Sequence, residues 1–216
     1  VVFGSMGTAL CFETKTSVKR GPSAPESENT VKGAKDAFTE TMRINTSLVR
    51  RHLRAPQLRL RQKTIGMRSK TAVTICYLAD LTAPELVSRM EKRLDTIDID
   101  GLLTPAAVEE YITGSRKTAF PLLQYTERPD TFCQGLLDGQ LGLLVDGLPL
   151  GYLAPVSIGI LMKSTEDRAV DYISASCLRV LRYVALLAAL LLPGVYVAMA
   201  TYHQQMLPTK LLLAII

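Results

Sequence analysis

Residues 183–202 read YVALLAALLLPGVYVAMATY, and this stretch decides the architecture of the chain. It contains no Asp, Glu, Lys, Arg or His. At ~1.5 Å of helical rise per residue, ~20 residues span the ~30 Å hydrocarbon thickness of a bilayer. A buried core helix is the alternative, but such helices normally keep a polar stripe, and here only Tyr and Thr interrupt the apolar run. We predict a transmembrane helix over Tyr183–Tyr202.

Pro193 lies inside this apolar run. Proline breaks most soluble helices, whereas transmembrane helices tolerate it when neighbouring groups satisfy the freed carbonyl. We therefore predict a kink at Pro193 that faces protein. After Lys210 the sequence LLLAII predicts the start of a second transmembrane helix from about residue 211. The chain does not begin with Met, and we expect it to be truncated at both ends.

The basic residues around the first span indicate its orientation. Arg179 and Arg182 precede it, and only Lys210 follows it. By the positive-inside rule, the region before the span is expected on the cytoplasmic side. The apolar run is C-terminal, so a cleaved N-terminal signal peptide is excluded. The four cysteines are far apart in the sequence, and no two of them have the spacing of a zinc-binding pair: Cys11, Cys76, Cys133 and Cys177. They predict free thiols in a reducing compartment.

The region before the span is predicted to be a mixed α/β (α+β) soluble fold. Residues 1–30 are expected to hold the tail of a first α/β subdomain, with a strand at 9–12, plus a linker at 16–29 rich in Ser, Pro and charge. Residues 31–163 form a second α/β subdomain. The pattern of residues 5–16 resembles that of residues 138–149, which leaves an internal duplication open.

Hydrophobic periodicity predicts the elements of the second subdomain. A helix carries Phe38, Met42, Val49 and Leu53 on one side and ends before Pro56. Strands are expected at 58–61 and 71–78, separated by a turn at 66–69.

Three further helices and a strand pair follow. Thr82 with Glu85 predicts a capping box for a helix with an apolar face at 86, 90 and 94. Thr104 and Pro105 open a second helix, and a third runs over Pro129–Asp138 until Gly139. Strand 141–145 is expected to return over 148–153 through a turn at Asp146-Gly147.

Residues 164–216 are predicted to hold a connecting helix, the first span and the start of the second. Residues 164–167 (STED) are expected to cap the connecting helix, which continues through Val170, Ile173 and Cys177 into the span. No helix breaker lies between Thr165 and Arg182. We hypothesise that this helix transmits movement between the soluble domain and the membrane.

Signatures of catalysis and metal binding are missing from the sequence. His52 and His203 are the only histidines, and no hydrolase elbow, phosphate loop or dinucleotide fingerprint occurs. Residues 95–100 contain three aspartates before Gly101, but the EF-hand frame set by this glycine puts Ala107 where a bidentate Glu is required. The sequence therefore predicts no enzyme, no cofactor and no metal site.

A basic stretch without acidic residues extends from Thr41 to Ala79. Its nine basic residues are Arg43, Arg50, Arg51, Arg54, Arg59, Arg61, Lys63, Arg68 and Lys70. Such a field attracts nucleic acid, anionic lipid headgroups or acidic faces of neighbouring subunits. Tyr77 is the only aromatic residue in the stretch, and nucleic-acid binding generally uses several for stacking. Nucleic acid is therefore not expected as a partner.

Several segments together resemble the A-subunit family of bacterial spore germinant receptors, the GerA family, which includes stage V sporulation AF proteins. They are VKGAKDAFTETMRINTSLVRRHLR (31–54), IDIDG (97–101), FP with QYTERPD (120–130), LLVDGLP (143–149) and RVLRYVALLAALLLPGVYVAMATYHQQMLPT (179–209). Residues 32–35 read KGAK where the family usually has KGPR, and Gln140 stands where Arg is common. The TERPD segment and the proline-interrupted span are the most specific parts.

The resemblance implies a multi-pass protein of the spore inner membrane whose N-terminal region lies on the cytoplasmic (core) side. It implies a homo-oligomer that works with a transporter-like B subunit and a lipoprotein C subunit, contributes to an ion channel and triggers germination on nutrient sensing. A structural or interface role is implied for Thr126, Glu127, Arg128, Pro129, Asp130, Asp146, Gly147, Arg179, Arg182 and Pro193. The alternative is a non-conducting scaffold or accessory subunit.

Overall fold

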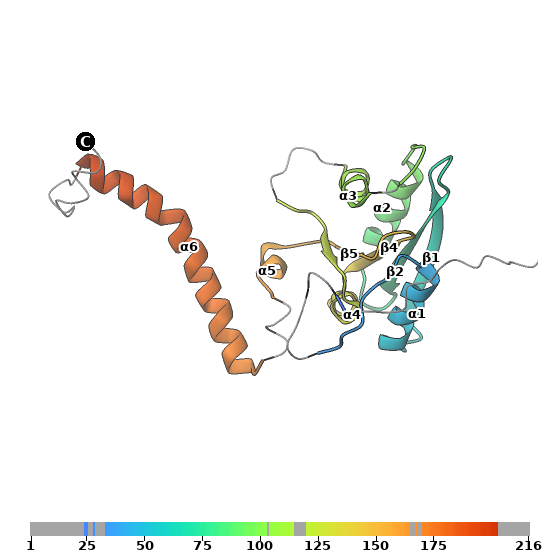
Figure 1. The fold of residues 1–216 in the computed structure, drawn as a ribbon, viewed down its shortest axis with the longest axis horizontal. Helices are drawn as coiled ribbons and strands as arrows, with labels where there is room; N and C mark the ends of the chain where they lie inside the picture. The colour runs from blue at the N-terminus through green and yellow to red at the C-terminus, as the bar shows by residue number, and fades with distance from the viewer. Residues whose placement is uncertain are drawn as a thin grey trace, which may run out of the picture.

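Five antiparallel strands form a sheet in the order β1-β2-β4-β5-β3 (Figure 1). The computed structural model describes residues 24–25, 28, 33–102, 104–114, 120–164, 167 and 170–202. The strands are β1 (Leu58–Ile65), β2 (Thr71–Leu78), β3 (Gln124–Thr126), β4 (Leu141–Val145) and β5 (Gly151–Ala154). The long strand β1 and the short strand β3 are therefore the two opposite edges of the sheet.

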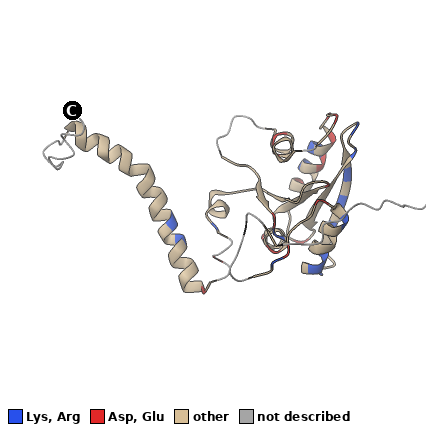
Figure 2. Cartoon of the chain, viewed as in Figure 1, with Lys and Arg blue, Asp and Glu red and all other residues tan. Residues whose placement is uncertain are grey.

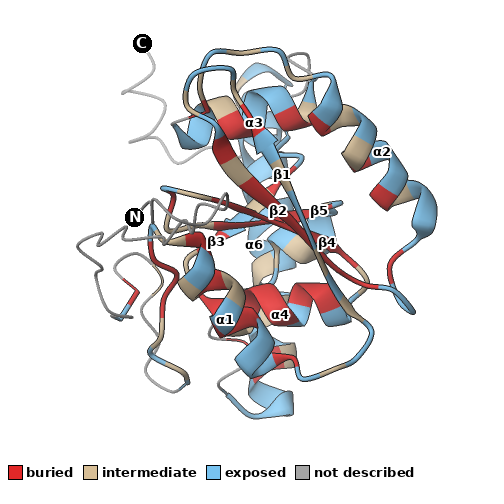
Figure 3. Cartoon of the chain, turned by 90° about the vertical axis from the view of Figure 1, so that its right-hand side faces the viewer, coloured by how far each residue is buried: buried red, intermediate tan, exposed pale blue. Residues whose placement is uncertain are grey.

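Two pairs of helices cover the two faces of the sheet (Figure 3). Helices α1 (Met42–His52) and α4 (Pro129–Leu137) pack on one face, and α2 (Pro84–Asp95) and α3 (Pro105–Thr113) cover the other. Because successive side chains of a strand point to opposite faces, Ile75 of β2 contributes to the core under α2 and α3, whereas Cys76 contributes to the core under α1 and α4. The predicted mixed α/β domain is confirmed as three layers.

Prolines set the first turns of three of these helices. Pro84, Pro105 and Pro129 each stand at the start, where a missing backbone N–H costs nothing. Helix α3 begins at Thr104 and Pro105 as predicted, and the hydroxyl of Thr104 accepts a hydrogen bond from the N–H of Ala107. The capping box at Thr82 is wrong, because Pro84 fixes the start of α2 and Ala83 is the cap residue. The Thr82 side chain is instead buried, and its hydroxyl donates to the carbonyl of Gln140.

The predicted helix around Phe38 begins later than its periodicity suggests. Residues 33–41 are not helical, and α1 starts only at Met42. Phe38 is buried nonetheless, because its ring packs edge-on against Phe132 of α4 with the centroids 5.4 Å apart. The hairpin also differs: β5 begins at Gly151, not at Leu148. Strand β3 and the short helix α5 (Ile158–Leu161) were not predicted.

The C-terminal helix α6 (Tyr172–Tyr202) runs through Pro193 and is bent (Figure 1). A bend is the usual consequence of a proline that removes one bond of the helical ladder. The predicted continuous helix from Ser164 is wrong, since Val170 and Asp171 lie outside helical structure. Within the described residues, α6 is the one helix long and apolar enough to cross a membrane. The predicted strand at 9–12, the predicted second span and most of the predicted linker lie outside the described residues.

Close packing of α4 on the sheet generates the first prediction. A methyl group on Gly151 of β5 would lie 2.6 Å from Cδ2 of Phe132 and 2.8 Å from Cε2 of Phe38. We expect Gly151→Ala to lower the free energy of unfolding of the domain by about 1–3 kcal/mol, because both rings must move. The measurement is urea unfolding of the chain in detergent micelles, followed by near-UV circular dichroism.

A matched glycine provides the control for this measurement. No atom lies within 4 Å of a methyl group placed on Gly194, in the exposed part of α6, so Gly194→Ala leaves the unfolding of the domain unchanged. Adding Phe132→Leu to Gly151→Ala should recover part of the loss. Equal stability of Gly151→Ala and the parent chain would contradict the packing described.

Candidate functional site

The residues to which the resemblance assigns a role lie at three places. Residues 126–130 join β3 to α4, Asp146 and Gly147 follow β4, and the remaining three lie on α6. The first two places both form backbone hydrogen bonds with the segment that leads into α1. The N–H of Phe38 donates to the carbonyl of Glu127, and the N–H of Gly147 donates to the carbonyl of Glu40, each at 2.8 Å.

Arg128 is the centre of the first place and is only 3% exposed. Its Nε donates to Oδ1 of Asp130 at 3.0 Å, and its Nη2 donates to Oδ2 at 2.6 Å. A planar guanidinium matches a carboxylate in this two-pronged arrangement. Burial acts to raise the pKa of Asp130, but hydrogen bonds from Arg128 and from the N–H of Thr131 outweigh it and leave the pKa below its ordinary value.

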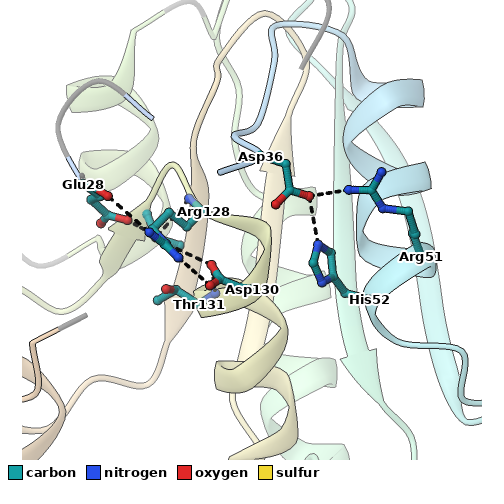
Figure 4. A network of polar contacts seen from close by, with 8 residues as sticks. Glu28, Asp36, Arg51, His52, Arg128, Asp130 and Thr131 are labelled. Carbon is teal, nitrogen blue, oxygen red and sulfur yellow. Dashed lines mark hydrogen bonds and ion pairs between the residues drawn. The ribbon is translucent and has the colours of Figure 1, made fainter. Parts of the chain in front are cut away.

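Glu28 connects this pair to the segment before the domain (Figure 4). Its Oε2 accepts a hydrogen bond of 2.6 Å from the hydroxyl of Thr126, and its carbonyl accepts one of 3.4 Å from Nη1 of Arg128. Burial raises the pKa of Glu28, although the Thr126 hydrogen bond opposes the rise. The TERPD segment thus fixes a residue that the sequence assigned to a linker.

A second polar group lies beside the first and was missed from the sequence. Oδ2 of Asp36 lies 2.5 Å from Nη2 of Arg51 and 3.0 Å from Nε2 of His52 (Figure 4). Burial acts to raise the pKa of Asp36, but hydrogen bonding and charge from His52, with the charge of Arg51, lower it overall. His52 therefore helps to hold the extended segment against α1. Asp36 precedes the helix by several residues, so no local spacing rule reveals this contact.

Asp146 and Gly147 anchor the start of α1. Oδ1 of Asp146 accepts a hydrogen bond of 3.0 Å from the N–H of Met42, the first residue of the helix. A carboxylate at this point compensates the unpaired N–H groups and the positive end of the helix dipole. Gly147 has φ +86°, a left-handed conformation that favours glycine. The predicted turn residues therefore cap a helix that is distant from them in sequence.

The third place connects the domain to α6. Nη1 of Arg182 donates to the carbonyl of Met162, and the same guanidinium pairs with Asp167, with Nη1 3.0 Å from Oδ2 and Nη2 3.1 Å from Oδ1. The Asp167 side chain is only 3% exposed. The hydrogen bond from Arg182 lowers the pKa of Asp167, so this carboxylate is ionised at neutral pH. Arg179 lies one turn earlier; its buried Nε has no hydrogen-bond partner among the described residues.

The basic stretch contains no acidic residue in the sequence, but acidic residues from other segments lie next to it in the structure. Acidic residues from other segments neutralise four of its nine members: Arg51 pairs with Asp36, Arg61 with Glu91, Lys63 with Asp95 and Arg68 with Asp100. The stretch lies on α1, β1 and the β1–β2 turn, on the side of the domain away from α6 (Figure 2). This placement argues against lipid headgroups beside the span as its partner.

The polar contacts among the described residues position segments of the chain, and few of the side chains are suited to catalysis or metal binding. Among them, no group of three or more His, Cys, Asp and Glu side chains could hold a metal ion. Burial raises the pKa of Cys76 and raises that of Cys133 to about 12, so neither thiol is a ready nucleophile. A surface groove of about 380 Å³ between α2 and α3 is lined by apolar residues and by Arg89, Lys92 and Arg93.

The buried pair at Arg128 generates the second prediction. We expect Arg128→Gln to lower the free energy of unfolding by about 1–3 kcal/mol, because it leaves Asp130 and the carbonyl of Glu28 without their charged donor. The lowered pKa of Asp130 means that its stabilising contribution is complete above its unfolded pKa of about 3.9 and is lost as pH falls through the folded pKa. Arg128→Gln should therefore flatten the loss of stability on acidification, measured by urea unfolding at several pH values.

Arg51→Gln is the matched control, since it removes a guanidinium from a pair in which Arg51 is 58% exposed. Exposed pairs contribute at most about 1 kcal/mol. If Arg51→Gln destabilised the domain as much as Arg128→Gln, burial of Arg128 would not be the source of the effect.

Known proteins similar to this chain share its segments from end to end. The chain is 37% identical over 206 residues to "Uncharacterized membrane protein YfkQ" of Bacillus subtilis, covering 95% of this chain and 40% of that protein. It is 38% identical over 185 residues to "Spore germination protein XA" of Bacillus anthracis, covering 86% of this chain and 38% of that protein. The chain thus spans about two fifths of the length of these curated relatives.

A solved structure and a family description complete the comparison. The crystal structure of the N-terminal domain of the A subunit of the Bacillus megaterium spore germinant receptor GerK3 is 39% identical, with a TM-score of 0.46, and covers 56% of this chain and 97% of that one. The family described as "Bacillus/Clostridium GerA spore germination protein" matches residues 1–216. Because this match extends over the whole chain, the protein belongs to the GerA spore germination family.

Proposed function

We propose that this chain supplies the α/β domain and the first transmembrane helix of a membrane subunit in a spore germinant receptor complex. In this function the subunit couples nutrient sensing to ion release and germination. The observation that carries the proposal is the junction of the two parts. Helix α6 exposes its apolar side chains, and Arg182, directly before the apolar run, contacts Asp167 and the carbonyl of Met162. A movement of the domain can reach the membrane through this contact.

The proposed subunit is a multi-pass protein of the spore inner membrane with its α/β domain on the cytoplasmic (core) side. Lys163, Arg179 and Arg182, which precede the apolar run, support this orientation by the positive-inside rule. Its proposed partners are further copies of itself, a transporter-like B subunit, a lipoprotein C subunit and the lipid bilayer. The oligomer would form a channel component, with additional spans lying beyond α6.

A non-conducting scaffold is the second candidate, and one observation favours it. No ionisable group other than Tyr occurs between Tyr183 and Tyr202, whereas membrane segments along ion pathways usually carry polar or charged groups. Conductance of the purified full-length oligomer in a planar bilayer separates the candidates, because only a channel component passes current.

The contact at Arg182 generates the third prediction. In the full-length protein, Asp167→Asn and Arg182→Gln should each slow nutrient-triggered germination severalfold at unchanged protein level, because α6 loses its ion pair with the buried Asp167 carboxylate. The charge exchange Asp167→Arg with Arg182→Asp should recover part of the rate. Germination is measured by the release of ions from spores after nutrient addition.

Arg68→Gln is the control for a general effect of charge. Arg68 pairs with Asp100 at 3.4 Å, and both side chains are highly exposed. Arg68 belongs to the β1–β2 turn, which lies on the side of the domain away from α6 (Figure 1), so this variant should germinate at the parental rate. Parental germination of Asp167→Asn and Arg182→Gln would contradict coupling through this contact.

A further inference from the structure

Exposed apolar side chains gather at the edge of the domain that carries β3 and α5. Ile158 and Leu161 of α5 are 56% and 38% exposed, and Tyr125 of β3 is 57% exposed. Phe120 and Leu122, in the segment that leads into β3, are exposed as well. Ile160 of α5 and Gln124 of β3 line the same small cavity, so the two elements are neighbours. Successive side chains of a strand alternate, so Tyr125 points to the other side of β3, and the exposed apolar residues flank both sides of this edge.

This edge lies beside the base of the transmembrane helix. The carbonyl of Met162, directly after α5, accepts a hydrogen bond from Arg182. A methyl group on Gly159 of α5 would lie 3.9 Å from the hydroxyl oxygen of Tyr183. Figure 1 shows α5 between the sheet and α6. Since Tyr183 is the first residue of the predicted span, α5 lies at the level where that span would enter the bilayer.

The composition around α5 fits the boundary layer of a bilayer. Residues 155–162 (PVSIGILM) contain no charge, and Lys163 follows them. Segments that rest in the headgroup layer bury apolar side chains and keep flanking Lys or Arg groups among the phosphates. Tyr side chains are enriched at the same depth. Tyr183 lies beside Gly159 of α5, and Tyr125 is exposed on the adjoining β3 edge. The opposite edge, strand β1, carries Arg59, Arg61 and Lys63 and lies far from α6.

We propose that α5 and the adjoining β3 edge form a membrane-docking surface, which rests on the headgroup layer of the same bilayer that α6 crosses. The occupant of the surface is lipid, because the surface is continuous with the base of the span. The inference depends on the proposed function only in requiring that α6 spans a membrane. Docking would fix the tilt of the α/β domain relative to the bilayer in addition to the contact at Arg182.

Tryptophan fluorescence tests this proposal directly, because the 216 residues contain no Trp. Single variants I158W and Y125W place an indole on the surface, M67W places one on the far β1–β2 turn, where Met67 is 74% exposed, and L190W places one within the span. The 216-residue chain is inserted into phosphatidylcholine–phosphatidylglycerol vesicles, with or without phosphatidylcholine brominated at the headgroup end of its acyl chains. Emission is also recorded with acrylamide, which quenches from the water.

Lipid docking predicts that I158W and Y125W emit at shorter wavelength than M67W, lose emission to the brominated lipid and resist acrylamide. Y125W guards against a folding defect specific to α5. If L190W is quenched by brominated lipid while I158W and Y125W behave like M67W, the docking proposal is overturned and the span stands. Resistance to acrylamide without quenching by brominated lipid would assign the surface to a protein partner and overturn the proposal. Failure of L190W to respond to brominated lipid would overturn the span, and docking with it.

Discussion

The apolar surface of α6 is the constraint on which the arrangement of the chain depends. Leu186, Leu190 and Val197 are among many large side chains that the domain leaves uncovered, and water around such a surface is costly at about 25 cal/mol per Å². A bilayer removes this cost, and a helix suits it because nearly all backbone hydrogen bonds are made within the helix, apart from the one that Pro193 removes. With α6 spanning a bilayer as proposed, Arg182 and Lys163 lie on the water side and Tyr183 lies at the boundary.

Polar contacts position the parts of the domain, and the apolar cores supply most of its stability. The guanidinium of the buried Arg128 donates hydrogen bonds to the carboxylate of Asp130, at the start of α4, and to the main-chain carbonyl of Glu28. Replacing such a buried pair with apolar groups is often neutral in free energy, whereas removing one partner is costly. The value of Arg128 therefore lies in specifying where Glu28 and the residues before α1 must lie. Asp146 specifies the same segment from its other end.

Local signals in the sequence predicted the elements that local physics determines. Pro105 and Pro129 mark helix starts. The alternation in β1 marks a partly exposed edge strand, and the continuous apolar run of β4 marks a central strand that is buried on both faces. Prediction failed where a distant contact decides. Phe38 is periodic with α1 yet lies outside it, since Phe132 and Glu127 hold it in an extended segment. Strand β3 is only three residues long and forms because it pairs with β5. The hydroxyl of Thr82 donates to the carbonyl of Gln140 and does not cap α2. The resemblance pointed to the motif residues, but it did not predict that Asp146 would accept a hydrogen bond from Met42, or that Thr126 and Arg128 would bind Glu28.

The break before Tyr172 changes how movement can pass from the domain to the membrane. A helix continuous from Ser164 would act as a stiff rod and would carry rotation as well as displacement. The structure instead attaches α6 through side chains and one carbonyl, at Arg182, Asp167 and Met162. Such an attachment carries displacement toward or away from the base of the span, but it resists rotation only if a second contact lies off the helix axis. Helix α5, placed against Tyr183 beside that axis, is where the fold supplies this second contact.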